Sequence, residues 1–128
     1  MAAVWSHEAI DSMGFASDAP AIGTPYLESL ARPAGVVYFP LTKRMIKVGR
    51  AAENDLIVDE SFIGWQTVSR HHAEIERDGE DIFLFDLGTT NGVPINGQQT
   101  GSNLLQQDGT ISFGQLQFAF RMNKELKL

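Results

Sequence analysis

The stretch that decides the fold reads Val68-Ser69-Arg70-His71-His72-Ala73-Glu74-Ile75. It places a hydroxyl, a guanidinium and two imidazoles in four consecutive positions. Directly afterwards apolar and polar residues alternate, which is typical of a strand with one buried face. The stretch therefore predicts a loop that delivers polar side chains to the beginning of a β-strand.

Two further stretches have the same design. Upstream, the apolar pattern of residues 45–48 ends in Gly49-Arg50 and a polar turn, and downstream the apolar run 82–87 leads into a polar loop at 88–92. Hydrogen-bond donors on loops of a rigid scaffold are what a tetrahedral dianion requires. The donors that the three loops supply are the side chains of Arg50, Ser69, Arg70, Thr90 and Asn91.

Length and composition indicate one domain with its own core. The chain has 128 residues and no cysteine, so neither disulfides nor thiolate metal sites are possible. The first ten residues carry no cationic lead and no long apolar run, and no stretch approaches the ~20 apolar residues of a membrane span. We expect a cytoplasmic protein without a cofactor.

The charge balance narrows the choice of partner. Sixteen acidic residues against ten basic ones give a formal net charge of −6, which disfavours nucleic acid and anionic membranes. A local cationic pocket formed by Arg50 and Arg70 could still attract one phosphate group, because salt confines the influence of distant charges to about 8 Å. Partner choice is therefore expected to come from the pocket.

Short apolar segments separated by turn residues follow from Thr24 onward. Residues 25–39 and 110–120 are each predicted to form a hairpin, the second with its turn at Gly114-Gln115. The run 82–87 shows no alternation and is predicted to be a central strand buried on both faces. About ten such strands with glycine turns predict an all-β sandwich. Alternate residues of the last strand predicted to face the core are Leu116, Phe118 and Phe120.

The three loops resemble those of the forkhead-associated (FHA) domain, a β-sandwich that binds phosphothreonine peptides. The resemblance runs from about residue 24 to residue 121 and rests on Gly49-Arg50, the serine-x-x-histidine of residues 69–72, and Asn91-Gly92, in that order. It implies two sheets of about eleven strands in total, with the binding loops at one end. The expected organisation is an N-terminal tail over 1–23 that could contain a short helix, the FHA domain over 24–122, and a C-terminal tail or linker over 123–128.

The resemblance also implies a role for each loop residue. Arg50 and Ser69 would contact the phosphate, and Arg70 would contact phosphate or peptide backbone. Thr90 matches the hydroxyl position before the family's asparagine, and Asn91 would bond to the ligand's backbone. The residues matched as structural support are Gly49, His72 and Gly92.

Two departures from the family pattern lie beside the expected site. The arm of residues 92–97 contains Pro94 and lacks a threonine that the family often has, and the segment 59–68 is several residues longer than usual. Phe62 and Trp65 in that segment are either packed against the domain or part of a partner surface. These departures affect which residues the site would prefer on either side of the phosphothreonine in the ligand.

The function expected from the loops is that of a non-catalytic signalling module that recognises phosphothreonine segments of kinase substrates. We expect it to be one domain of a larger protein. The alternative is a phosphate-independent scaffold or oligomerisation domain that uses a sheet face. A hydrolase triad of Ser69, a neighbouring histidine and Asp86 lacks a nucleophile elbow. A metal site at His71 and His72 lacks a third ligand, and adjacent strand residues point to opposite faces. No catalytic residue and no metal ligand is expected.

Overall fold

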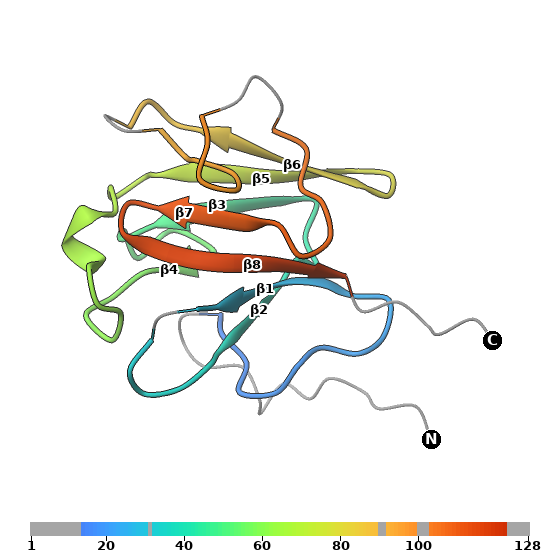
Figure 1. Cartoon of the computed structure of the whole chain (residues 1–128), viewed down its shortest axis with the longest axis horizontal. Coiled ribbons are helices and arrows are strands. Elements are labelled where there is room, and N and C mark those ends of the chain that lie inside the picture. The colour runs from blue at the N-terminus through green and yellow to red at the C-terminus, as the bar shows by residue number, and fades with distance from the viewer. Residues whose placement is uncertain (1–13, 31, 90–91, 100–102, 123–128) are drawn as a thin grey trace.

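The structure is a computed structural model in which residues 14–30, 32–89, 92–99 and 103–122 are described. They form two four-stranded sheets that pack face to face, with strand orders β2-β1-β8-β7 and β4-β3-β5-β6 (Figure 1). The strands are β1 (Pro25–Ser29), β2 (Tyr38–Pro40), β3 (Met45–Gly49), β4 (Leu56–Ile57), β5 (Ala73–Asp78), β6 (Asp81–Asp86), β7 (Thr110–Phe113) and β8 (Leu116–Met122), and a short 3-10 helix, η2, spans Trp65–Thr67.

The all-β sandwich is confirmed, whereas the strand number is lower than expected. The described residues contain eight strands and not about eleven. The segments beside the binding loops make only single bridges, such as Ile95 with Ile111 and Phe83 with Leu104. A proline and a tight turn in the arm of residues 92–97 leave too few consecutive backbone groups for a ladder. The turn itself is as predicted, because Asn96 and Gly97 have φ values of 54° and 76°.

Both predicted hairpins are present in the first sheet. β1 pairs antiparallel with β2, with Leu27 opposite Phe39, and β7 pairs antiparallel with β8 around the turn that contains Gly114. β8 lies beside β1, so the two hairpins join into one sheet. The residues of β8 predicted to share a core face, Leu116, Phe118 and Phe120, are all buried.

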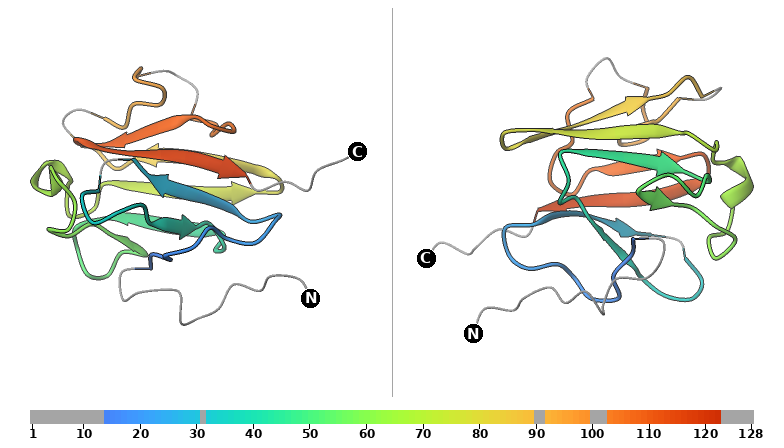
Figure 2. Two further views of the ribbon diagram at one scale, coloured as in Figure 1. Left: turned by 60° about the horizontal axis from the view of Figure 1, so that its bottom comes forward. Right: turned by 180° about the vertical axis from the view of Figure 1, so that it is seen from behind.

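The second sheet corrects one prediction. β6 lies at the edge of the sheet, and its residues alternate between buried and more exposed positions. Ile82 and Leu84 face the core, while Phe83 is half-buried and Phe85 is 39% exposed on the outer face. The prediction of a central strand buried on both faces was wrong, because no third layer among the described residues covers this sheet, as the two views of Figure 2 illustrate.

The core lies between the sheets and is rich in aromatic rings. The ring of Phe15 lies 5.6 Å from that of Phe39 and 5.4 Å from that of Phe62. Phe15 is only 2% exposed, and Ala16 forms a bridge with Tyr38, so these two residues of the expected tail pack on the sandwich. The predicted short helix lies largely in residues 1–13, outside the described residues, and the domain boundary at residue 24 stays a prediction. No helix in the described ranges is long and apolar enough to cross a membrane.

Candidate functional site

The register of the second sheet brings the beginnings of all three loops to one end of the sandwich. Val48 pairs with Ala73, and Ala73 pairs with Asp86 on its other side. The loop after β3, the loop before β5 and the loop after β6 therefore leave the sheet side by side (Figure 1). The loop with Arg50 follows β3 and the loop with Arg70 precedes β5, so these two arginines start from adjacent stretches of backbone.

Backbone hydrogen bonds join the first two loops beyond the ends of their strands. The N–H of Arg50 donates to the carbonyl of Ser69 at 3.0 Å, and the N–H of Ala51 donates to the carbonyl of Arg70 at 3.1 Å. Below them the N–H of His72 donates to the carbonyl of Val48 at 2.8 Å. These bonds hold three of the predicted site residues, Arg50, Ser69 and Arg70, in one cluster. We call this cluster the phosphate cradle, after the ligand expected from the sequence.

Within the phosphate cradle, Arg50 is fixed by one end of its guanidinium. Its Nε donates to the carbonyl of Val68, and the side chain is half-buried. Within the described ranges its two terminal nitrogens have no hydrogen-bond partner. A guanidinium held in this way keeps its forked donors for an anion and has little freedom left to lose when the anion binds.

Gly49 is required because the two loops approach each other so closely. A Cβ at this position would lie 2.1 Å from the carbonyl oxygen of Arg70 and 2.9 Å from the side-chain nitrogen of Asn54. No side chain fits in that space. The glycine that precedes the arginine in the sequence pattern therefore permits the contact that holds Arg50 beside Ser69.

Asn54 is a support residue that the sequence analysis missed. It is buried, and its side-chain nitrogen donates to the carbonyls of Ala51 at 3.0 Å and of Arg70 at 2.7 Å. It thereby ties its own loop to the serine-bearing loop. In the sequence Asn54 is one of three polar turn residues, and no local pattern distinguishes the one that turns inward.

His72 holds the serine-bearing loop from within the core. It is 2% exposed, and its Nδ1 accepts a hydrogen bond from the N–H of Ser69 at 2.9 Å. Burial lowers the pKa of His72, and the nearby Asp86 carboxylate opposes this only in part. The imidazole is therefore neutral at pH 7 and acts as an acceptor. Its Nε2 is buried and has no partner among the described residues.

These contacts also bear on the two rejected chemistries. Ser69 meets His72 through its backbone N–H and not through its hydroxyl, so the nucleophile and base pair of a triad is not formed. His71 is exposed, and its Nε2 lies 4.0 Å from a carboxylate oxygen of Glu53. The described residues contain no group of three histidine, cysteine or acidic side chains that could hold a metal ion.

The third loop is shaped at its start by Asp86. The carboxylate of Asp86 accepts hydrogen bonds from the N–H groups of Gly88 and Thr89, both at 3.2 Å. On the far side of the loop, Gly92 has a φ of 69°, and a Cβ there would lie 2.5 Å from the side chain of Gln99. Thr90 and Asn91 lie outside the described residues, so their roles stay predictions.

The long segment before the serine-bearing loop packs against the domain. Phe62 is 3% exposed within the core, and Trp65 packs on the edge of the core. The segment is also tied to the β7–β8 turn, since the N–H of Gln115 donates to the hydroxyl of Thr67 at 2.8 Å. Of the two alternatives for Phe62 and Trp65, packing is the one observed. Ile63 is 69% exposed.

Comparison with known proteins identifies the class of this sandwich. The FHA domain model matches residues 46–114, which is more than half of the chain and includes both loops of the phosphate cradle. The chain belongs to the FHA domain family.

Two relatives place the chain within that family. It is 31% identical over 100 residues to the transcriptional regulatory protein EmbR of Mycobacterium tuberculosis, which is 78% of this chain and 23% of EmbR. It is 30% identical over 82 residues to the oxoglutarate dehydrogenase inhibitor of Corynebacterium jeikeium, which is 64% of this chain and 54% of that protein. The chain thus spans about half or less of these relatives.

Solved structures agree with this assignment. The structure of Mycobacterium tuberculosis EmbR in complex with a low-affinity phosphopeptide matches 85% of this chain and 27% of its own, with a TM-score of 0.68 and 25% identity. The FHA domain of the CT664 protein from Chlamydia trachomatis matches 77% of this chain and 96% of its own, with a TM-score of 0.64 and 24% identity. The second likeness supports the fold alone.

Proposed function

We propose that this FHA domain is a non-catalytic module that binds phosphothreonine segments of partner proteins through the phosphate cradle. The observation that carries the proposal is the backbone pairing of the loops, in which Arg50 donates to Ser69 and Ala51 to Arg70. This pairing puts the backbones of Arg50 and Ser69 side by side, so a guanidinium and a hydroxyl start from neighbouring positions. The phosphopeptide bound to the related EmbR structure supports the same chemistry here.

The proposed roles follow from the donors. Arg50 and Ser69 bind the phosphate oxygens, and Arg70, which is exposed beside them, binds phosphate or peptide backbone. Thr90 and Asn91 would add a hydroxyl and a backbone contact. The residues proposed to support these contacts without touching the ligand are Gly49, His72 and Gly92.

The strength of binding can be judged from the charge of the ligand. A phosphothreonine carries about −1.5 to −2 charges and three acceptor oxygens. Hydrogen bonds to charged groups contribute roughly 1.5–3 kcal/mol each, so Arg50 with two hydroxyls can supply most of the ~8 kcal/mol of a micromolar complex. Burial of the threonine methyl adds about 0.8 kcal/mol, so a strong preference over phosphoserine also needs the stiff rotamer of the β-branched residue.

The context of the domain is part of the proposal. Residues 24–122 are taken as the FHA domain, with residues 1–23 as an N-terminal tail and residues 123–128 as a C-terminal tail or linker. We infer that the domain acts within a larger protein, as EmbR and the oxoglutarate dehydrogenase inhibitor extend well beyond the matched region. Cytoplasmic location and the absence of nucleic acid partners stay predictions.

A phosphothreonine peptide library tests the proposal and identifies the preferred flanking residues. Each peptide is compared with its phosphoserine and unphosphorylated forms, and loss of the phosphate is expected to weaken binding at least about tenfold, or 1.4 kcal/mol. Because the second pKa of the phosphate is about 6, binding should also weaken as the pH falls from 7 to 5. Equal binding of phosphorylated and unphosphorylated peptides would reject the proposal.

A further inference from the structure

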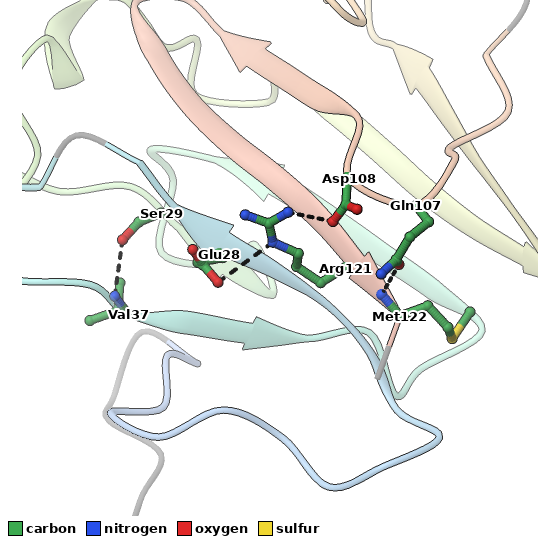
Figure 3. A network of polar contacts seen from close by, with 7 residues as sticks. All are labelled: Glu28, Ser29, Val37, Gln107, Asp108, Arg121 and Met122. Atoms are coloured by element: carbon green, nitrogen blue, oxygen red, sulfur yellow. Dashed lines mark hydrogen bonds and ion pairs between the residues drawn. The ribbon is translucent and has the colours of Figure 1, made fainter. Parts of the chain in front are cut away.

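The outer faces of the two sheets differ in how their charges are satisfied. On the first sheet, the guanidinium of Arg121 contacts Asp108 and lies 3.6 Å from the carboxylate of Glu28, so both acids have a partner (Figure 3). On the second sheet, Glu74 and Glu76 occupy the centre of the outer face. Neither carboxylate has a hydrogen bond or ion pair with any other described residue.

The strand register shows what surrounds these two carboxylates. Glu76 lies between Met45 on β3 and Phe83 on β6, and Glu74 lies between Lys47 on β3 and Phe85 on β6. Lys47 is exposed and forms no ion pair with Glu74. Met45 is 43% exposed and Phe85 is 39% exposed. Each carboxylate is thus flanked by an aromatic residue on the same face. The aliphatic part of an arginine or lysine side chain can pack on such a ring while its charged end pairs with the carboxylate.

The face is hollowed and is continuous with the third loop. A groove of about 500 Å³ is lined by Glu76, Phe83 and Phe85. Its lining also contains two cations and a second acid, from Arg44, Arg77 and Asp78. Leu87, which is 42% exposed, follows Phe85 in the same alternation and leads directly into the loop beside the phosphate cradle. An extended segment seated along β6 would therefore reach toward the cradle.

The charge of the whole molecule is concentrated on this hairpin. Residues 73–86, which form β5, its turn and β6, contain six acidic residues and one basic residue, a formal charge of −5, whereas the whole chain has a charge of −6. The remaining sequence is nearly neutral. A cationic occupant is therefore attracted to this face in particular, and an acidic one is repelled from it.

We propose that the outer face of β5 and β6 is a second docking surface, which takes a segment of a partner protein in which arginine or lysine alternates with apolar residues. The cations pair with Glu74 and Glu76, and the apolar residues pack on Phe83, Phe85 and Leu87. Alternation suits the face because successive residues of an extended segment point to opposite sides. Binding at this surface does not require phosphate, so the inference goes beyond the proposed function of the cradle.

The test uses two unphosphorylated peptides of equal charge, one alternating arginine with leucine and one alternating arginine with glycine. Each is titrated into the isotope-labelled chain and followed by backbone amide NMR shifts. The arginine and leucine peptide is expected to shift the amides of β5 and β6 and to bind at least about tenfold more tightly than the glycine peptide. Equal binding of both peptides, or amide shifts centred on β1 and β8, would overturn the proposal. Either result would mean that the peptide binds through non-specific attraction to an acidic protein.

A pair of matched variants separates the face from the net charge. Glu74→Gln with Glu76→Gln is expected to weaken binding of the arginine and leucine peptide about tenfold. Asp18→Asn with Glu60→Gln removes the same charge from exposed positions outside the hairpin and is expected to change the affinity less than about threefold. Equal losses in both variants would overturn the proposal, as would a dimer in light scattering that only the first variant dissociates. Arg50→Ala should leave binding of this peptide unchanged. The proposal for the outer face can therefore be rejected without rejecting the proposed function of the phosphate cradle, and the reverse.

Discussion

The loops of the phosphate cradle satisfy one another's polar groups, whereas the outer face of β5 and β6 leaves its central carboxylates unpaired within the described chain. In the cradle, the buried side chain of Asn54 is bonded to the opposite loop and that of His72 to its own loop, so the frame is held by the chain itself. On the outer face, Glu74 and Glu76 are half-buried beside aromatic side chains. If both proposals hold, the same sheet carries a preformed site at its end and a charge-driven docking surface on its side, and the difference lies in how far the chain satisfies its own polar groups.

The largest effect is expected where the two loops touch. Gly49→Ala places a methyl group 2.1 Å from the carbonyl oxygen of Arg70, so the loops must separate. We expect a loss of about 3 kcal/mol in the free energy of unfolding, measured by chemical denaturation. The control is Gly35→Ala, where the space is open and only the φ of 118° is unfavourable, at a cost of about 1 kcal/mol. Equal losses in the two variants would mean that the loops are not in close contact.

A smaller effect is expected when the side-chain tie between the loops is cut. Asn54→Ala removes donors from the carbonyls of Ala51 and Arg70, both of which keep one backbone partner. The free energy of unfolding should fall by about 1–2 kcal/mol, and phosphopeptide affinity should fall because Arg70 loses its anchor. Gln66→Ala, at an exposed position in the neighbouring segment, serves as the control. Unchanged affinity for the peptide in Asn54→Ala would show that the frame does not depend on this tie.

The buried imidazole predicts how stability depends on pH. Burial lowers the pKa of His72 in the folded chain. Between pH 7 and pH 5 the imidazole is therefore protonated more readily in the unfolded chain than in the folded chain. Stability should therefore be lost as the pH falls below about 6.5, at up to about 1.4 kcal/mol per pH unit for this residue. Denaturation curves at several pH values measure the slope.

Two histidine variants show whether that slope belongs to His72. His72→Gln should flatten the loss between pH 7 and pH 5 while keeping an acceptor for the N–H of Ser69. His71→Gln, at the exposed neighbour, should leave the slope as it is in the wild type. A slope that persists in His72→Gln would assign the loss to other groups.

The smallest effect is expected on the first sheet, where the charges are already paired. Arg121→Gln breaks the contacts to Asp108 and Glu28 at the surface (Figure 3). Such exposed pairs contribute about 0.5 kcal/mol, and less at high salt. Thermal denaturation at low and high salt measures the difference. A loss above about 2 kcal/mol in the free energy of unfolding would show that surface charge pairs stabilise this sheet as strongly as the buried contacts stabilise the loops, which contradicts the difference described above.

The sequence predicted local features well because turns and alternation are local. The hairpins, the Asn96-Gly97 turn and the core face of β8 follow from neighbouring residues and are present in the structure. The edge position of residues 82–87 could not be predicted, since exposure of a sheet face depends on whether another layer covers it. In the same way Asn54 gave no signal, because the inward turn of a polar side chain depends on carbonyls of a distant loop.

The central claim is that Arg50 in the phosphate cradle recognises the phosphate of a phosphothreonine. The most direct measurement is calorimetric titration of one phosphothreonine peptide and its unphosphorylated form into the wild type, Arg50→Ala and the control Arg44→Ala, an exposed arginine of the other end. The phosphate should strengthen binding to the wild type and to Arg44→Ala by at least about 1.4 kcal/mol, and this gain should vanish in Arg50→Ala. Because Arg50→Ala also loses the hydrogen bond to Val68, it should melt a few degrees lower but remain folded, as circular dichroism would show. A gain that survives in Arg50→Ala, or no gain in the wild type, would contradict the account.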